Sequence, residues 1–244
     1  MRKAAALIIA VLVLAHAACG PGGDAVNRGI FAHSRLDYVE GQDGVSSIQF
    51  DKDITLWTFA DTIIPLKSSG NKSSSTMISN SIAWTERITA ANCGNIRFNY
   101  FMESGRVAQF IKNRKGENPL KNRLWALDGV RTGNGVYVYY AHVYVPDPSK
   151  FLDFSIKYTG LAKWDVKDGW KPGDGFEFRR GAVLFPEGYP VFGAAATLRD
   201  GYVYVAGHSK RGNAFPVSIA RVKEADIENP HAYEFLDASG GWTS

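Results

Sequence analysis

The sequence is poor in cysteine, in net charge and in helical periodicity. Its 244 residues include two cysteines, Cys19 and Cys93, which excludes a fold held together by a disulfide framework. The formal net charge of +4 falls to +2 when the positive charges of Arg2 and Lys3 are left out, and no basic run is interleaved with aromatic residues. We therefore expect no nucleic-acid partner. The scarcity of apolar residues at helical spacing favours an all-β chain.

Several catalytic signatures are also absent. The chain contains no glycine-rich phosphate loop, no cluster of histidine and cysteine at zinc spacing, and no G-x-S-x-G nucleophile motif. These absences argue against a P-loop enzyme, a zinc site of ordinary spacing and a hydrolase with a serine nucleophile elbow. We expect no cofactor and no metal from the sequence.

The first 29 residues predict export. "MRKAAALIIAVLVLAHAAC" starts with two basic residues, continues with an apolar run and ends in small residues, which predicts a signal peptide over residues 1–18. "AHAAC" resembles a bacterial lipobox, which would lipidate Cys19 and anchor a cell-envelope lipoprotein in the membrane. Ala15-His16-Ala17 also fits an ordinary cleavage site, which would give a secreted or periplasmic protein. Residues 19–29, with several Gly and Pro, predict a flexible tether, and residues 30–244 the folded domain.

The strongest strand signals share one pattern. "ITLWTFAD" (54–61), "GVYVYYAH" (135–142) and "GYVYVAGH" (201–208) carry aromatic residues at matching positions, and turn residues precede each copy. A second strand is expected just upstream of each, and a weaker unit, "NSIAWT" with "GNIRFNYF", lies between the first two. In residues 54–61 both faces of the strand are largely apolar, so we expect it to be covered on both sides.

Four irregularly spaced hairpin units, each with outer strands, predict a β-propeller in which every blade packs against neighbours on both faces. A sandwich or a jelly roll is the alternative, because uneven spacing weakens any argument from repeats. Four units do not complete a ring, so we expect a propeller that lacks a C-terminal part. Some propellers hold an axial calcium, but no run of oxygen ligands indicates one here.

Asp61 is the first candidate site residue, because the matching positions in the other copies are Ala141 and Ala206. A residue needed to build a blade should recur in every blade. If the two strands of the first hairpin run out and back, Asp43 lies at the same end as Asp61. Paired carboxylates are what glycoside hydrolysis needs, one as acid and one as base or nucleophile. The alternative is that Asp61 caps a turn through nearby backbone amides.

Three further residues are candidates for substrate binding, each with a structural alternative. Asp128, in a second Asp-Gly-Val sequence, is either a site carboxylate or a turn residue. Trp125 could stack on a sugar ring or be buried between blades. His142 ends its strand and could hydrogen-bond a sugar hydroxyl or lie on the surface.

The ordered series "GQDGVSSIQFDKDITLWTFADT", "NSIAW", "GVYVYYAHV" and "GAAATLRDGYVYVAGHSKRG" with "VSIARV" resembles the domain-of-unknown-function 4185 family. That resemblance covers residues 30–244 and implies a five-bladed propeller, with about four blades present here. Some members are endo-D-arabinanases of glycoside hydrolase family 183. The resemblance implies Asp43 and Asp61 as the acid/base pair, with Asn80 and Ser81 lining the same mouth. Members usually have Gly-Asp-Thr where this chain has Ala60-Asp61-Thr62.

Two functions are therefore expected. The first is an exported hydrolase, endo-arabinanase-like, whose substrate is an arabinan or a related furanose polysaccharide. The second is a non-catalytic carbohydrate-binding or scaffold propeller at the cell surface, which would use Asp61 to hold a hydroxyl or a turn. A third interpretation is a shortened chain that does not fold alone.

Overall fold

The computed structural model describes residues 38–66, 74–89, 91–93, 96–150 and 152–244, and this part of the chain is all-β. Its regular elements are antiparallel strands and two short 3₁₀ helices, Glu224–Asp226 and Pro230–Ala232. The predicted all-β class is confirmed. The signal peptide, the lipidation site at Cys19 and the tether lie outside the described residues.

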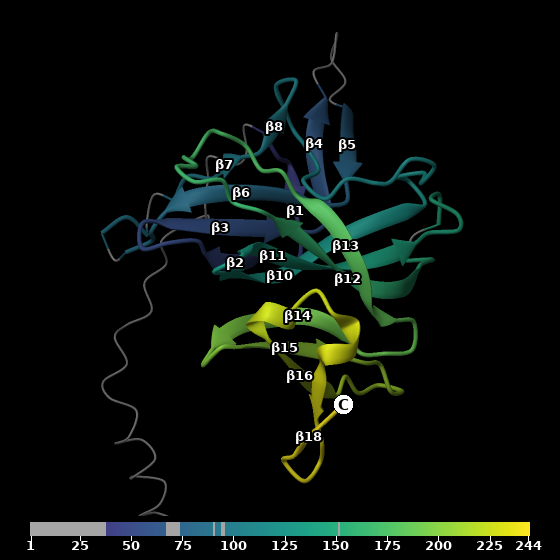
Figure 1. The fold of residues 1–244 in the computed structure, drawn as a ribbon. Helices are drawn as coiled ribbons and strands as arrows, with labels where there is room; N and C mark the ends of the chain where they lie inside the picture. Colours follow the sequence, from purple (N-terminus) through teal and green to yellow (C-terminus); the bar gives the residue numbers. More distant parts are fainter. Residues whose placement is uncertain (1–37, 67–73, 90, 94–95, 151) are drawn as a thin grey trace, which may run out of the picture. The chain divides into compact units, whose positions relative to one another are not determined.

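Three sheets of four or five strands follow one another along the chain (Figure 1). The first comprises β2 (Ser46–Gln49), β3 (Ile54–Phe59), β6 (Ser81–Glu86) and β7 (Asn99–Tyr100). The second comprises β10 (Asn122–Thr132), β11 (Gly135–Tyr144), β12 (Ser155–Trp164) and β13 (Arg179–Pro186). The third comprises β14 (Val191–Arg199), β15 (Tyr202–His208), β16 (Val217–Lys223), β17 (Glu234–Leu236) and β18 (Trp242–Thr243).

The described residues also form two smaller sheets. The hairpin of β4 (Thr62–Leu66) and β5 (Ser74–Ile78) pairs with the short β1 (Gly41–Gln42). β8 (Met102–Glu103) and β9 (Arg106–Val107) form a separate hairpin. The β4–β5 hairpin is inserted between two strands of the first sheet that are direct neighbours, β3 and β6.

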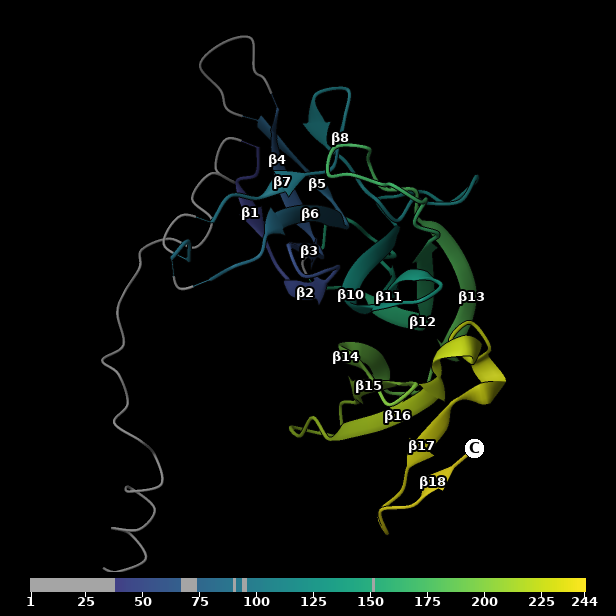
Figure 2. The ribbon, with the colours of Figure 1, turned by 60° about the vertical axis from the view of Figure 1, so that its left-hand side comes forward.

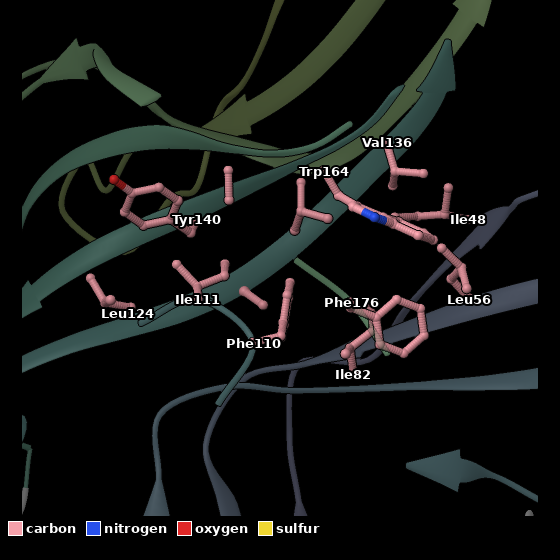
Figure 3. Close-up of a cluster of buried hydrophobic side chains, with 13 residues drawn as sticks. Ile48, Leu56, Ile82, Phe110, Ile111, Leu124, Val136, Tyr140, Trp164 and Phe176 are labelled. Atoms are coloured by element: carbon pink, nitrogen blue, oxygen red, sulfur yellow. The ribbon is translucent and has the colours of Figure 1, made fainter. Parts of the chain in front are cut away.

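The second sheet is buried on both faces (Figure 2). One face packs on the first sheet through a core that includes Leu56, Leu124 and Trp164, and Figure 3 shows these side chains together. The other face packs on the third sheet through a core that includes Tyr139 and Phe192. The first strand of the middle sheet, β10, contacts the first strands of both neighbours, β2 and β14. This stacking matches the way that blades pack, and a two-layer sandwich would leave no sheet buried on both faces.

The two-sided character of residues 54–59 is explained by two different layers. Leu56 faces the core shared with the second sheet. Trp57 and Phe59 point the other way and pack with Phe98, whose ring centroid lies 5.4 Å from that of Trp57 and 5.3 Å from that of Phe59. The strand is therefore covered on both sides, by a neighbouring sheet on one face and by the segment around Phe98 on the other.

The division into four units was wrong at its second unit. "NSIAWT" does not begin a new hairpin, because β6 pairs with β3 in register from Ile54↔Glu86 to Phe59↔Ser81. The first two predicted units thus form one sheet, and the count of about four blades in a five-bladed ring is not confirmed. The inserted β4–β5 hairpin separates the partners in sequence and hides their pairing.

Candidate functional site

Asp43 and Asp61 lie side by side at one end of the first sheet. β2 and β3 pair antiparallel, so the segment that leads into β2 and the segment that follows β3 meet at the same end, and Asp43 and Asp61 lie on these two segments. The backbone N–H of Asp43 donates to the carbonyl of Asp61 at 3.2 Å, and the N–H of Ala60 donates to the carbonyl of Asp43 at 3.0 Å. The structure thus brings together the backbones of the two aspartates that the hairpin geometry predicts to be neighbours.

Gly44 allows the two turns to approach. Its φ is +57°, a left-handed conformation that favours glycine, and a Cβ added there would lie 2.9 Å from the Cβ of Ala60. A side chain at position 44 would therefore push the Asp43 turn away from the Asp61 turn.

Arg123 pairs with Asp61 from the second sheet. Its Nη1 lies 3.2 Å from Oδ1 and 3.3 Å from Oδ2 of Asp61, and 3.5 Å from the sulfur of Met77. The two charged side chains are only 15% and 18% exposed, for Arg123 and Asp61 respectively, so water screens the pair less than it screens a surface ion pair. Arg123 was not among the predicted site residues, and its one signal in the sequence is a basic residue directly before the apolar run of residues 124–127.

The pKa values of both carboxyl groups are raised. Burial raises the pKa of Asp61 more than the charge of Arg123 and the indole of Trp125 lower it. Partial burial also raises the pKa of Asp43, the negative charge of Asp61 adds to this, and the backbone N–H of Asp61 opposes it. Carboxyl pairs in which one group is harder to ionise than its neighbour are a recurring basis of acid/base catalysis.

Trp125 lies two residues after Arg123 on β10, so both side chains project from the same face of the strand. Its indole N–H is buried and makes no hydrogen bond, although it is near enough to Asp61 to lower the pKa of that carboxyl. The ring packs edge-on against Phe154, with centroids 5.0 Å apart. Trp125 is thus a wall of the carboxylate site, with Phe154 packed against it at an interplanar angle of 75°.

Asn80 and Ser81 support the site from behind and do not line its mouth. Both are fully buried. The amide of Asn80 donates to the carbonyls of Ile111 and Leu124, at 3.1 and 3.0 Å, and accepts from the N–H groups of Phe110 and Ile111, at 3.1 and 2.9 Å. The Ser81 hydroxyl shares a hydrogen bond of 2.8 Å with Thr62. The expectation that these two residues face an open mouth was wrong, because their polar atoms are used inside the protein.

The carboxylate of Asp128 hydrogen-bonds to backbone amides of the protein. Its Oδ1 accepts from the N–H of Gly129 at 2.9 Å and its Oδ2 from the N–H of Ala196 at 2.8 Å. It lies in an irregularity of β10 between Ala126 and Gly129, and it links the second sheet to β14 of the third. Both carboxylate oxygens thus bind backbone amides, which favours the turn interpretation over contact with a ligand.

His142 lies on the other face of the second sheet. In the β10–β11 register His142 pairs with Leu124, whereas Trp125 pairs with Ala141, so His142 points away from the carboxylate site. Its ring stacks on Tyr158 with centroids 4.7 Å apart, and neither ring nitrogen has a hydrogen-bond partner. Burial and the nearby charge of Arg180 lower its pKa. The structure does not bring His142 together with Asp43 and Asp61.

A pocket of about 470 Å³ lies at the opposite end of β3 and β6, remote from the carboxylates. It is lined by one indole, two aliphatic side chains and three charged ones: Trp84, Ile54, Pro172, Asp53, Glu86 and Arg87. Among the residues that the structure covers, no three His, Cys, Asp or Glu side chains converge in a way that could hold a metal ion. Nor does that part of the chain contain a helix long and apolar enough to cross a membrane.

The family model described as "Domain of unknown function (DUF5005)" matches residues 31–244, so the chain belongs to that family. The matches do not show the domain-of-unknown-function 4185 family that the motifs resemble. Among solved structures, one from Bacteroides ovatus ATCC 8483, described as "a putative hydrolase", is similar with a TM-score of 0.58 at 20% identity. The match covers 84% of this chain and 54% of that one, so this chain spans about half the length of the Bacteroides protein. None of the curated proteins matches the chain.

Proposed function

We propose that this member of the DUF5005 family is a glycoside hydrolase that cleaves an arabinan or a related furanose polysaccharide with Asp43 and Asp61. The observation that carries the proposal is that these two aspartates are neighbours at one end of the first sheet, with backbone hydrogen bonds of 3.0 and 3.2 Å between their turns and an electrostatic effect of Asp61 on Asp43. Glycoside hydrolysis requires one carboxyl to protonate the leaving oxygen and a second to act as base or nucleophile.

The surroundings of the pair suit this chemistry. Burial raises both pKa values, which favours the protonated form that a general acid needs. Arg123 and Trp125 form a wall beside Asp61 from a second sheet. Two further points support the proposal. The motifs resemble the domain-of-unknown-function 4185 family, some of whose members are endo-D-arabinanases, and the similar Bacteroides structure is described as "a putative hydrolase".

The test is release of oligosaccharides from D-arabinan and L-arabinan by the purified mature chain. It compares the wild type with Asp43→Asn, Asp61→Asn and the control Asp200→Asn, an exposed carboxylate in the turn between β14 and β15. Circular dichroism confirms that each variant is folded. We expect release by the wild type and the control and a loss of at least about 100-fold in the two site variants. A folded wild type that releases nothing from either polymer would overturn the proposal.

A second candidate is a non-catalytic carbohydrate-binding domain, and the pocket around Trp84 favours it. An indole beside carboxylate and guanidinium groups offers an apolar surface for a sugar ring and polar groups for its hydroxyls. Affinity electrophoresis in arabinan gels tests this with Arg87→Ala and Glu86→Gln, two exposed positions. If these variants lose retardation and Asp61→Asn keeps it, binding resides in the Trp84 pocket.

We also propose, from the N-terminal sequence, that the protein is exported and anchored through a lipid on Cys19. Radiolabelled palmitate incorporated by cells that express the wild type, but not Cys19→Ala, would support the anchor. Equal labelling of both would contradict it.

A further inference from the structure

We propose that Arg123 is a positioning residue that keeps Asp61 ionised and thereby makes Asp43 the proton donor of the pair. The inference rests on the proposed hydrolase, and it assigns the two roles that the sequence leaves interchangeable. It also adds a third residue, from a different sheet, to the site.

The first step is the asymmetry of the contacts. Asp61 has a guanidinium within 3.2 and 3.3 Å of its two oxygens. Among the residues that the structure describes, Asp43 has no cationic partner, and the backbone N–H of Asp61 is the group that favours its ionised form. The adjacent positive charge stabilises the Asp61 anion against the cost of its burial, so we expect this carboxyl to lose its proton first.

The second step is the effect of that anion on its neighbour. Once Asp61 is charged, ionising Asp43 places a second negative charge beside it in a partly shielded site, and the charge of Asp61 indeed raises the pKa of Asp43. The charged groups that face the pair are Arg123 from β10 and each aspartate toward the other. The β4–β5 hairpin contributes Met77, which carries no charge. Among the described residues no positively charged side chain pairs with Asp43, and the backbone N–H of Asp61 is the group that opposes the repulsion there.

The third step is the indole of Trp125. Its buried N–H has no acceptor in the structure but lies close enough to Asp61 to favour the anion. Catalytic hydrogen bonds often lengthen in the unliganded protein and tighten when substrate binds. Arg123 and Trp125 thus provide two donors from one strand face to the same carboxylate. Asp43 would then give its proton to the leaving glycosidic oxygen, which keeps the electron pair of its broken bond to the anomeric carbon.

The test is a titration of the aspartate side chains by carbon-13 NMR, with the two signals assigned from Asp43→Asn and Asp61→Asn. We expect Asp61 to ionise at lower pH than Asp43 in the wild type. Arg123→Ala should raise the pKa of Asp61 by about 1 unit or more, and Arg123→Lys should restore part of that shift. Arg131→Ala is the matched control, because Arg131 lies on the same strand at its far end and contacts Phe50 and Thr132.

Two results would overturn the assignment: ionisation of Asp43 before Asp61, or an Asp61 titration that Arg123→Ala leaves unchanged while the variant remains folded by thermal melting. If Arg123→Ala does not fold, Arg123→Lys and the wild-type titration order decide. The titration needs no turnover, so it is read independently of sugar release. Absence of hydrolysis overturns the proposed function, whereas the wrong order of ionisation overturns the role of Arg123.

Discussion

Asn80→Ala should destabilise the protein far more than the removal of an ordinary asparagine. The side chain is completely buried and makes hydrogen bonds of 3.1, 3.0, 3.1 and 2.9 Å with backbone groups of Phe110, Ile111 and Leu124. The substitution leaves two buried N–H groups and two buried carbonyls without this partner. At about 1–3 kcal/mol for each unsatisfied group, with partial relaxation, we expect a loss of about 3–6 kcal/mol in the free energy of unfolding.

That loss is a large fraction of the ~5–15 kcal/mol that a domain typically has. It corresponds to a fall in Tm on the order of 10–20 °C for a domain of this size. The consequence reaches the site as well, because Leu124, which Asn80 holds, lies between Arg123 and Trp125 in the sequence. Loosening this strand should weaken the Arg123–Asp61 ion pair.

The assay is urea unfolding followed by circular dichroism, with calorimetric melting as a second measurement. Asn99→Ala is the matched control, because Asn99 is exposed and donates a single bond, of 3.3 Å, to the carbonyl of Trp84. It should change stability by about 0.5 kcal/mol or less. If the free energy of unfolding of Asn80→Ala is within about 1 kcal/mol of the wild-type value, the hydrogen bonds of Asn80 do not have the stabilising role inferred for them.

Three other substitutions test the packing and charge of the site. Gly44→Ala should cost about 1–3 kcal/mol of stability in urea unfolding, because φ at this position is +57° and the new methyl would lie 2.9 Å from the Cβ of Ala60. Unchanged stability would contradict the close approach of the two turns. Asp43→Asn should be more stable than the wild type at pH 7. The folded-state pKa of Asp43 is raised, so ionising Asp43 costs the folded chain free energy, and the stability advantage of the variant should vanish below the ordinary pKa of 3.8. Urea unfolding at pH 7 and at pH 3 measures this advantage. An advantage that persists at pH 3 would refute the charge explanation. Asp128→Ala should lose about 2–4 kcal/mol in the free energy of unfolding, because the backbone N–H groups of Gly129 and Ala196 lose their acceptor. Asp128→Asn should lose less. An equal loss in both variants would contradict the role of the carboxylate oxygens as acceptors.

The strands were largely predictable, and their partners less so. Alternation and repeated aromatics identified β3, β11 and β15, because residues of a strand that point to the same buried face are apolar and recur at every second position. The pairing of β3 with β6 was not predictable in the same way. Alternation carries no record of which strand lies beside which, and the inserted β4–β5 hairpin separates the two in sequence.

The site was predictable where local geometry determined it. A hairpin brings its two outer ends together, which places Asp43 beside Asp61 without any long-range information. Arg123 comes from another sheet, so the sequence could not pair it with Asp61. Asn80 was misassigned because the sequence alone does not distinguish a buried asparagine that hydrogen-bonds to backbone groups from an exposed asparagine that binds sugar. The number of partners that the fold supplies distinguishes them.

The most direct test of the central claim is a crystal structure of the Asp61→Asn chain with an arabinofuranosyl oligosaccharide bound. The account predicts a sugar ring at the end of β3, with a glycosidic oxygen within hydrogen-bond distance of the Asp43 carboxyl and Arg123 beside the same linkage. An oligosaccharide bound only in the pocket around Trp84, with the space beside Asp43 empty, would contradict the hydrolase and leave a carbohydrate-binding protein.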